Sequence, residues 1–413
     1  MKIQGFKRTK LACYSAYFTM SSIFSLPPLL FATLQDRYDI SYTLLGTLVL
    51  TNFCTQLGID LVFTFFSSKF NPKKIVKTMP LITSLGLIIY ALIPTFFPNI
   101  AYLGLLIGTI IFSVSAGLSE VLLSPMIAAS PSDDPKRDMS TLHSLYAFGV
   151  FTVVVISSLF LKLFGTDRWM ILTLFFGLLP IIPAVLFSIS PMPDMNPSVH
   201  TKETKSHKKH TIALALCVGC IFFGSCAENA MSNWISSYAE NALGISKTLG
   251  DILGMAMFAI LLGLARIIHA KYGKSIFRTL TVGMIGALVC YLTVGFTSNA
   301  TVALAACILT GLFTSMLWPG SLIMMEENLP GVGVAAFALM ASGGDLGAAI
   351  APQLLGIIVD TVSASTVASE LSTSLGLTTE QIGLRVGMLS ISVFPLIGIF
   401  VVLLTRRYFK RHK

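Results

Sequence analysis

The chain has 413 residues, of which 54% are hydrophobic and only 11% are charged, whereas an average soluble domain is about 25% charged. This composition excludes an ordinary water-soluble protein. The formal net charge of +9 would suggest nucleic-acid binding in a soluble protein, so the placement of the basic residues has to be considered first. The length suits a membrane bundle, because twelve helices of about 20 residues use about 240 residues and leave the rest for connections.

Twelve apolar runs are long enough to cross a bilayer as helices. The first run is too long for the core of a signal peptide and has no small-residue cleavage site, so we expect it to be retained. The sequence therefore predicts an all-α membrane protein with twelve transmembrane helices, at residues 11–34, 42–66, 75–96, 101–129, 139–164, 168–190, 211–239, 249–269, 276–296, 302–325, 332–360 and 382–405.

Lysine and arginine are distributed unevenly over the connections between these runs. With both termini on one side, that side carries 23 of them and the other side carries 5. Basic flanks resist translocation, so this bias predicts a multi-pass protein of the cytoplasmic membrane with both termini in the cytoplasm. It also explains the net charge without a nucleic-acid partner.

A proline-rich, basic segment at residues 191–210 separates the first six runs from the last six. Its three histidines are potential metal ligands, but a solvated loop beside anionic headgroups is the favoured interpretation. We therefore expect an N-terminal six-helix bundle at residues 1–190, a cytoplasmic linker at residues 191–210 and a C-terminal six-helix bundle at residues 211–413.

The two halves repeat each other weakly. Four residues near the start of the third run have counterparts 201 positions later: Lys73, Lys77, Thr78 and Tyr90 correspond to Lys274, Arg278, Thr279 and Tyr291. In the fourth run of each half, a Gly-Leu pair precedes a proline, as Gly117 precedes Pro125 and Gly311 precedes Pro319. Two pseudo-symmetric six-helix bundles are typical of secondary transporters that bind substrate near the membrane midplane.

No catalytic motif is present. All seven cysteines lie in apolar runs, where thiols behave as small hydrophobic groups, and the pair Cys217 and Cys220 has no second pair with which to form a metal site. A phosphate-binding loop, a zinc-protease helix and a serine-hydrolase elbow are all missing. The sequence predicts that the protein is not an enzyme and needs no cofactor or metal.

Four acidic residues lie well inside the apolar runs, away from their ends, where burying a charge is costly unless it faces a cavity or a partner. They are Asp60, Glu120, Glu228 and Asp345. Glu120 has no basic residue within a helical turn, so we expect it to bind a proton or a solute hydroxyl. The alternative is a structural hydrogen bond between helices.

The seventh run combines Glu228 and Asn229 with Trp234 and Tyr238. A carboxylate, an amide and aromatic rings along one helix suit a polyhydroxylated ligand, which needs hydrogen bonds and an apolar surface against its ring. The alternative is that the aromatic residues mark the membrane interface.

The remaining candidates have weaker signals. Asp345 follows two glycines and is expected to pair with Arg266 or another buried donor. His143 is a possible proton relay, although a lone histidine is more often a packing residue. Three further polar side chains complete the candidate set: Tyr146, Asn233 and Gln353.

At this level of detail the sequence resembles the major facilitator superfamily and, within it, the fucose:proton symporter family of sugar permeases. Four stretches carry the resemblance, at residues 117–125, 227–238, 264–274 and 311–319. In the first, a glutamate precedes a proline by five positions, as Glu120 precedes Pro125. The resemblance implies proton-coupled uptake of a hexose or deoxyhexose by alternating access, with Glu120 binding sugar or proton.

The sequence departs from that family in three places. The family's first-helix aspartate has no counterpart in residues 21–28, the fifth helix carries His143 and Tyr146 in place of a Gln-x-x-Asn pattern, and residues 67–74 lack the usual Asp-Arg-x-Gly-Arg loop. The resemblance therefore does not determine the substrate or the coupling ion, which have to be inferred from the candidate site residues.

We predict a secondary transporter, expected to be monomeric, that imports a small polar solute with a proton, a sugar being the leading candidate. An exporter or facilitator of amphipathic compounds is the alternative, in agreement with 29 phenylalanines and 17 methionines. A membrane receptor or scaffold would be expected to carry a sizeable soluble domain, and a membrane enzyme would need a nucleophile, a metal cluster or a phosphate loop.

Overall fold

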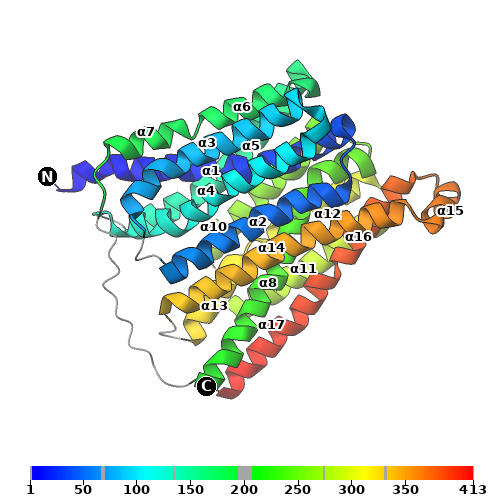
Figure 1. The fold of residues 1–413 in the computed structure, drawn as a ribbon. Helices are drawn as coiled ribbons and strands as arrows, with labels where there is room; N and C mark the ends of the chain where they lie inside the picture. Colours follow the sequence, from blue (N-terminus) through cyan, green and yellow to red (C-terminus); the bar gives the residue numbers. More distant parts are fainter. Residues whose placement is uncertain are drawn as a thin grey trace. The chain divides into compact units, whose positions relative to one another are not determined.

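The computed structural model describes residues 2–66, 70–133, 135–193, 207–272, 275–329 and 333–412. Within these ranges every regular element is helical and no strand occurs (Figure 1). Eleven helical segments are long and apolar enough to cross a membrane, and Phe148–Phe164 is a shorter apolar helix. The all-α membrane fold with twelve spans is confirmed.

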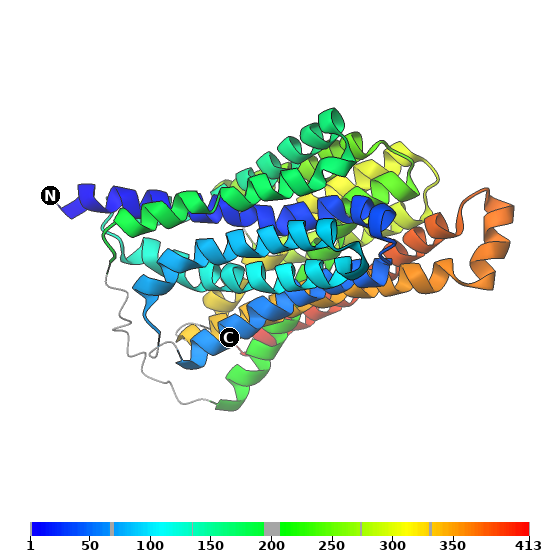
Figure 2. The same ribbon diagram turned by 45° about the horizontal axis from the view of Figure 1, so that its top comes forward.

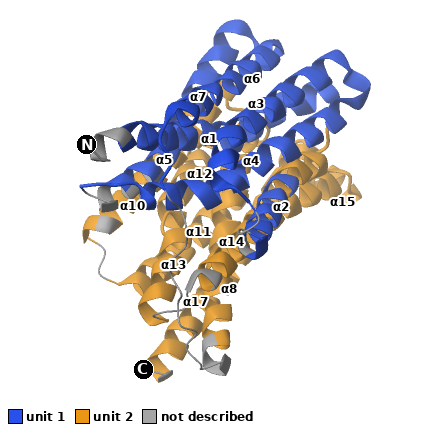
Figure 3. Cartoon of the chain, turned by 60° about the vertical axis from the view of Figure 1, so that its left-hand side comes forward, with its two compact units in different colours: residues 1–38, 51–199 blue, residues 39–50, 200–413 orange. Residues whose placement is uncertain are grey.

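The chain forms two compact units, coloured separately in Figure 3. Unit 1 consists of residues 1–38 and 51–199, and unit 2 consists of residues 39–50 and 200–413. The predicted bundles at residues 1–190 and 211–413 differ from this division at residues 39–50, which were expected in the N-terminal bundle and belong to unit 2. Residues 194–206 of the predicted linker lie outside the described ranges.

Unit 1 consists of apolar helices joined by short connections. Its helices are α1 (Lys2–Tyr38), the later part of α2 (Tyr42–Phe66), α3 (Pro72–Phe96), α4 (Ala101–Ala129), α5 (Pro135–Phe164), α6 (Trp169–Leu178) and α7 (Ile181–Ile189), with 3₁₀ turns at Pro98–Ile100 and Thr166–Arg168.

Glycines allow α3 and α4 to pack closely. A Cβ atom on Gly86 of α3 would lie 2.6 Å from the backbone nitrogen of Phe112, and one on Gly108 of α4 would lie 2.7 Å from that of Tyr90. Small residues at such crossings let helix backbones approach, which is the main source of packing energy between helices in lipid. The two helices make the most extensive contact in unit 1.

Unit 2 contains the other membrane spans. Its helices are α8 (His207–Ser237), the π-helical turn η4 (Tyr238–Ala242), α9 (Lys247–Leu249), the π-helical segment η5 (Gly250–Ala256), α10 (Met257–Tyr272), α11 (Ile276–Phe296), α12 (Ala300–Thr314), α13 (Leu317–Asn328), α14 (Gly333–Ser363), α15 (Thr366–Leu375), α16 (Thr379–Ile391) and α17 (Val393–His412). Helix α8 packs against both α14 and α17.

Helix α15 is an element that the hydropathy pattern does not predict. It is too short and too polar to span a bilayer, and it lies at the end of the α14–α16 pair in Figures 1 and 2. Local signals set its limits: the Ser365 side chain accepts from the Ala368 N–H at its start, and Gly376 adopts a left-handed conformation (φ 64°) at its end.

The beginning of α2 is held in unit 2 by polar contacts. The Asp360 carboxylate of α14 accepts hydrogen bonds from the backbone N–H groups of Tyr42 (3.1 Å) and Thr43 (2.6 Å). The Tyr42 hydroxyl donates to Glu380 Oε1 (2.6 Å) and accepts from Asn241 Nδ2 (2.7 Å). Asp360 therefore caps this helix end with a negative charge, which the helix dipole favours.

Candidate functional site

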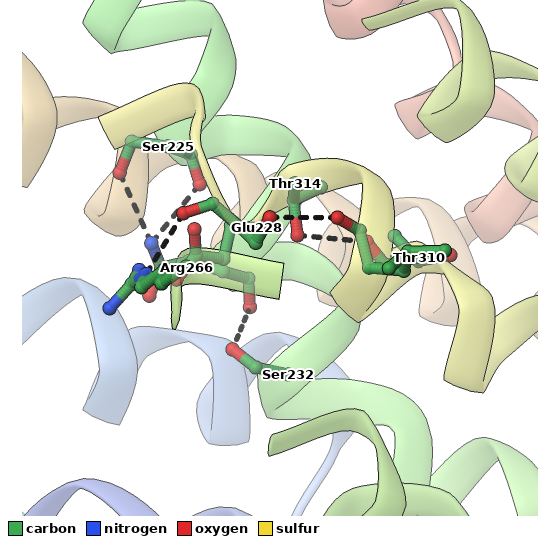
Figure 4. Close-up of polar contacts among 9 residues, drawn as sticks. Ser225, Glu228, Ser232, Arg266, Thr310 and Thr314 are labelled. Carbon is green, nitrogen blue, oxygen red and sulfur yellow. Dashed lines mark hydrogen bonds and ion pairs between the residues drawn. The ribbon is translucent and has the colours of Figure 1, made fainter. Parts of the chain in front are cut away.

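The clearest site in the described structure is an ion pair between two helices of unit 2. Glu228 on α8 and Arg266 on α10 point toward one another, with Oε1 and Nη2 separated by 3.5 Å (Figure 4). The Glu228 side chain is 19% exposed and that of Arg266 is 36% exposed. The pair is therefore neither sealed in the core nor fully solvated.

A proline in the tenth span positions Arg266. Pro319 has no N–H group, so it cannot donate to the carbonyl of Ser315 four residues earlier, and the span breaks there into α12 and α13. The Arg266 Nε–H group donates to this freed carbonyl oxygen at 2.9 Å. The guanidinium thus bridges the helix break and the Glu228 carboxylate, in line with the rule that freed backbone groups inside membranes find other partners.

Only one carboxylate oxygen of Glu228 is used by this pair. The other, Oε2, is buried and has no hydrogen-bond partner among the described residues. A carboxylate oxygen can accept a hydroxyl hydrogen bond or bind a proton. Leaving a buried oxygen unpaired costs about 1–3 kcal/mol, which a ligand that filled this position would recover.

Further polar groups follow along the same helix. The Asn229 amide donates to the carbonyl and the hydroxyl oxygens of Ser225, both at 3.1 Å, and the Asn233 amide donates to the Asn229 carbonyl at 2.8 Å. Figure 4 shows Ser225 and Ser232 of α8 with Thr310 and Thr314 of α12 beside the ion pair. These short side chains make hydrogen bonds within their own helices.

Trp234 of α8 and Tyr238 of the following turn η4 have no surface available for a ligand in this structure. Trp234 and Tyr238 are each 0% exposed. The Trp234 indole donates to the Pro352 carbonyl at 3.0 Å and packs on Tyr42, and the Tyr238 hydroxyl donates to the Val294 carbonyl at 2.8 Å. Their contacts are those of packing residues, and stacking on a substrate stays a prediction.

Glu120 lies on α4 of unit 1 and is partly buried. It forms no ion pair with another described residue. Tyr146 of α5 is in the same unit, where its ring packs edge-on against Tyr17 and Phe24. The side chain of His143 lies outside the described residues, so its predicted relay role is not addressed by these contacts.

The other predicted acids lie on other helices, Asp345 on α14 and Asp60 on α2. Asp345 on α14 is 3% exposed, and the arginine expected to neutralise it is the one that pairs with Glu228. Asp60 on α2 is half-buried. Gln353 on α14 has a buried Oε1 without a hydrogen bond to a described residue. No group of three or more His, Cys, Asp or Glu side chains in the described ranges is arranged to hold a metal.

Sequence reasoning found Glu228 but not its partner. The sequence predicts that Asp345 pairs with Arg266 or another buried donor, whereas in the structure Arg266 pairs with Glu228. Periodicity does not reveal which helices are neighbours. The proline at position 319 was a usable signal, because it predicts a free carbonyl at Ser315 that a nearby donor must satisfy.

Comparison with known proteins agrees with this architecture. The sequence model described as the Major Facilitator Superfamily matches residues 12–352. The search of curated protein sequences found no match.

Solved structures with the same fold cover nearly the whole chain. A bacterial homologue of the human lysosomal transporter Spinster matches with a TM-score of 0.75 at 13% identity, covering 98% of each chain. A D-xylose–proton symporter matches with a TM-score of 0.74 at 14% identity, covering 95% of this chain and 97% of that one. The fucose:proton symporter of E. coli matches with a TM-score of 0.56 at 14% identity, covering 95% and 99%. At these identities the likeness concerns the fold.

Proposed function

Since the chain belongs to the Major Facilitator Superfamily, we propose that it imports a small polar solute, a sugar of hexose or deoxyhexose size, together with a proton. Membership of this superfamily makes the protein a membrane transporter rather than an enzyme. The identity of the solute and its coupling to protons are the proposed part.

The observation that carries the proposal is the half-used carboxylate of Glu228. One oxygen faces Arg266, while the other is buried without a hydrogen-bond partner among the described residues. A sugar hydroxyl or a proton fits this vacancy chemically, and the adjacent amide of Asn229 offers a second hydrogen-bonding group. Two of the structural neighbours are sugar–proton symporters, which supports the same solute class.

Coupling requires a group whose protonation changes during transport. Glu228 and Glu120 are the candidates, because an ionised carboxylate is costly within a membrane unless it is paired, and each of them can be neutralised by a proton. A bound solute can shift the balance of inward-facing and outward-facing forms only by binding one form more tightly. A proton has the same effect if the carboxylate of Glu228 or Glu120 binds it more tightly in one form than in the other.

The test is transport by the purified protein in proteoliposomes. An imposed inward proton gradient should drive accumulation of a labelled monosaccharide from a panel of hexoses and deoxyhexoses. Glu228→Gln and Glu120→Gln should each reduce this accumulation about tenfold or more, because an amide cannot bind the proton. Exchange of labelled for unlabelled sugar should persist, because an amide still forms hydrogen bonds.

Glu326→Gln serves as the control, since this exposed carboxylate at the end of α13 belongs to neither site. If both glutamine variants at positions 120 and 228 keep full gradient-driven accumulation, proton coupling through these carboxylates is wrong.

A second function is favoured by a different observation. Residues 21–28 contain no acid, and the chain has 29 phenylalanines and 17 methionines, a composition suited to adaptable apolar binding surfaces. These features fit an exporter or facilitator of amphipathic compounds. Counterflow with a panel of amphipathic cations and weak acids in the same proteoliposomes, without any sugar exchange, would establish this function in place of sugar import.

A further inference from the structure

Unit 2 has a pocket of about 420 Å³ beside the helix break at Ser315. It is bordered by α10, α11 and the end of α12, and Glu228 is not among its lining residues. The side chains that matter for its chemistry are Ile268, His269, Arg278, Thr279, Val282 and Leu312.

One part of the pocket is polar and basic. The His269 Nδ1 atom lies 3.4 Å from the Thr279 hydroxyl, so the two side chains join α10 to α11. Arg278 precedes Thr279 and is exposed, and the Lys271 ammonium lies over the ring of Tyr272, another lining residue, at 5.3 Å. None of the described residues that line the pocket is acidic.

The other part of the pocket is apolar and open. Ile268 is 56% exposed, Val282 is 52% exposed and Leu312 is 36% exposed. All three belong to helices that cross the membrane, so their exposed surface suits hydrocarbon chains rather than water. Basic and apolar surfaces therefore adjoin within one pocket.

We propose that this pocket binds one anionic phospholipid of the cytoplasmic leaflet. The lipid phosphate lies against Arg278, whose planar guanidinium matches two phosphate oxygens, with His269 and Thr279 as further hydrogen-bonding groups. The first part of an acyl chain lies along Ile268 and Val282. The α10–α11 connection is on the side that the lysine and arginine distribution assigns to the cytoplasm, where anionic lipids are attracted to basic pockets between helices.

Two variants remove the two halves of the proposed site. Arg278→Gln removes the charge, and Val282→Trp fills the apolar part with a large side chain. The chain supplies a control for each. Val289 is on the same helix two turns further along, is 55% exposed and does not line the pocket, so Val289→Trp introduces the same side chain elsewhere. Lys77 is the repeat counterpart of Arg278 in the first half, so Lys77→Gln removes a charge at the equivalent position.

The experiment is native mass spectrometry of the full-length protein in detergent, titrated with dioleoylphosphatidylglycerol or with dioleoylphosphatidylcholine. The unmodified protein should retain one phosphatidylglycerol in preference to phosphatidylcholine. Arg278→Gln should weaken phosphatidylglycerol binding about fivefold, as expected for one basic residue near an anionic surface. Val282→Trp should weaken it at least as much, and both controls should bind like the unmodified protein.

Three results would overturn the proposal. Equal phosphatidylglycerol binding by Val282→Trp and Val289→Trp would exclude this pocket as the site. Equal retention of the two lipids would show that charge does not select the occupant, and displacement of the lipid by inorganic phosphate would show that the pocket recognises a free anion instead. All of these readouts are independent of transport, so they stand apart from the test of sugar import.

Discussion

At the scale of single residues, Arg266 stabilises a charge that the membrane would otherwise penalise. Removing it in Arg266→Gln leaves Glu228 without its counter-ion and should lower the free energy of unfolding by about 2 kcal/mol, between the values for exposed and buried pairs. The double variant Glu228→Gln/Arg266→Gln should be more stable than Arg266→Gln, because no charge is left unpaired. Thermal unfolding in detergent measures the stability of these variants and of Glu228→Gln. If the loss in the double variant equals the sum of the losses in the two single variants, the pairing is contradicted.

A second ionic cluster gives stability a dependence on pH. Asp138, in the first turn of α5 and before the apolar segment, accepts hydrogen bonds from Lys10, Ser132 and Tyr14. Partial burial raises the pKa of this carboxyl, but the three donors outweigh burial and hold its pKa below the ordinary value.

This depressed pKa determines the direction of the pH effect. The stabilisation is complete above the unfolded-state pKa of about 3.9 and is lost as pH falls through the lower folded-state pKa. The melting temperature of the unmodified protein should therefore decrease below about pH 4, and that of Asp138→Asn should decrease less. Asp133→Asn, at an exposed position, is the control, and identical pH profiles for all three proteins would refute the role of Asp138.

At the scale of helices, substitutions of two glycines by alanine should change the stability of the protein in opposite directions. Gly86→Ala places a Cβ atom 2.6 Å from the backbone nitrogen of Phe112, so α3 and α4 must separate, and stability should fall by about 1–3 kcal/mol. Gly58→Ala on α2 meets no atom within 4 Å and should gain up to about 1 kcal/mol from better helix propensity. Melting temperatures measure both, and a loss of equal size at both sites would contradict the close-packing argument.

The break in the tenth span is a second feature at this scale, and it follows from Pro319. Because Pro319 has no N–H group, the Ser315 carbonyl four residues earlier lacks its helical hydrogen bond, and Arg266 donates to it instead. The twelve spans themselves follow from hydropathy, because a membrane helix is recognised by its own length and composition. Helix α15 could not be found this way, since its limits depend on the cap residues Ser365 and Gly376 rather than on apolar content.

At the scale of the whole molecule, sequence patterns predicted the number of spans and the fold class but not the partners of the buried charges. Glu228 is predicted as a candidate site residue from its apolar surroundings, whereas its pairing with Arg266 depends on the packing of α8 near α10, which no local pattern encodes. Likewise Trp234 is of a residue type that can stack on a sugar ring, but in this structure it is fully buried. It packs on Tyr42 and donates to the Pro352 carbonyl.

The orientation of the chain in the membrane is a prediction at this same scale. The excess of lysine and arginine on one side, 23 against 5, places the C-terminus in the cytoplasm and the α15 segment outside. Green fluorescent protein fused after Lys413 should fluoresce, and alkaline phosphatase fused there should be inactive. Phosphatase inserted at Ser372 in α15 should be active, and the reverse pattern would invert the topology.

Helix α2 is shared between the two units. It is one continuous helix, yet residues 42–50 belong to unit 2 through the Asp360 cap and the Tyr42 hydroxyl, while residues 51–66 belong to unit 1. The attachment of its first turn to unit 2 therefore depends in part on one carboxylate, that of Asp360, which accepts from two backbone N–H groups.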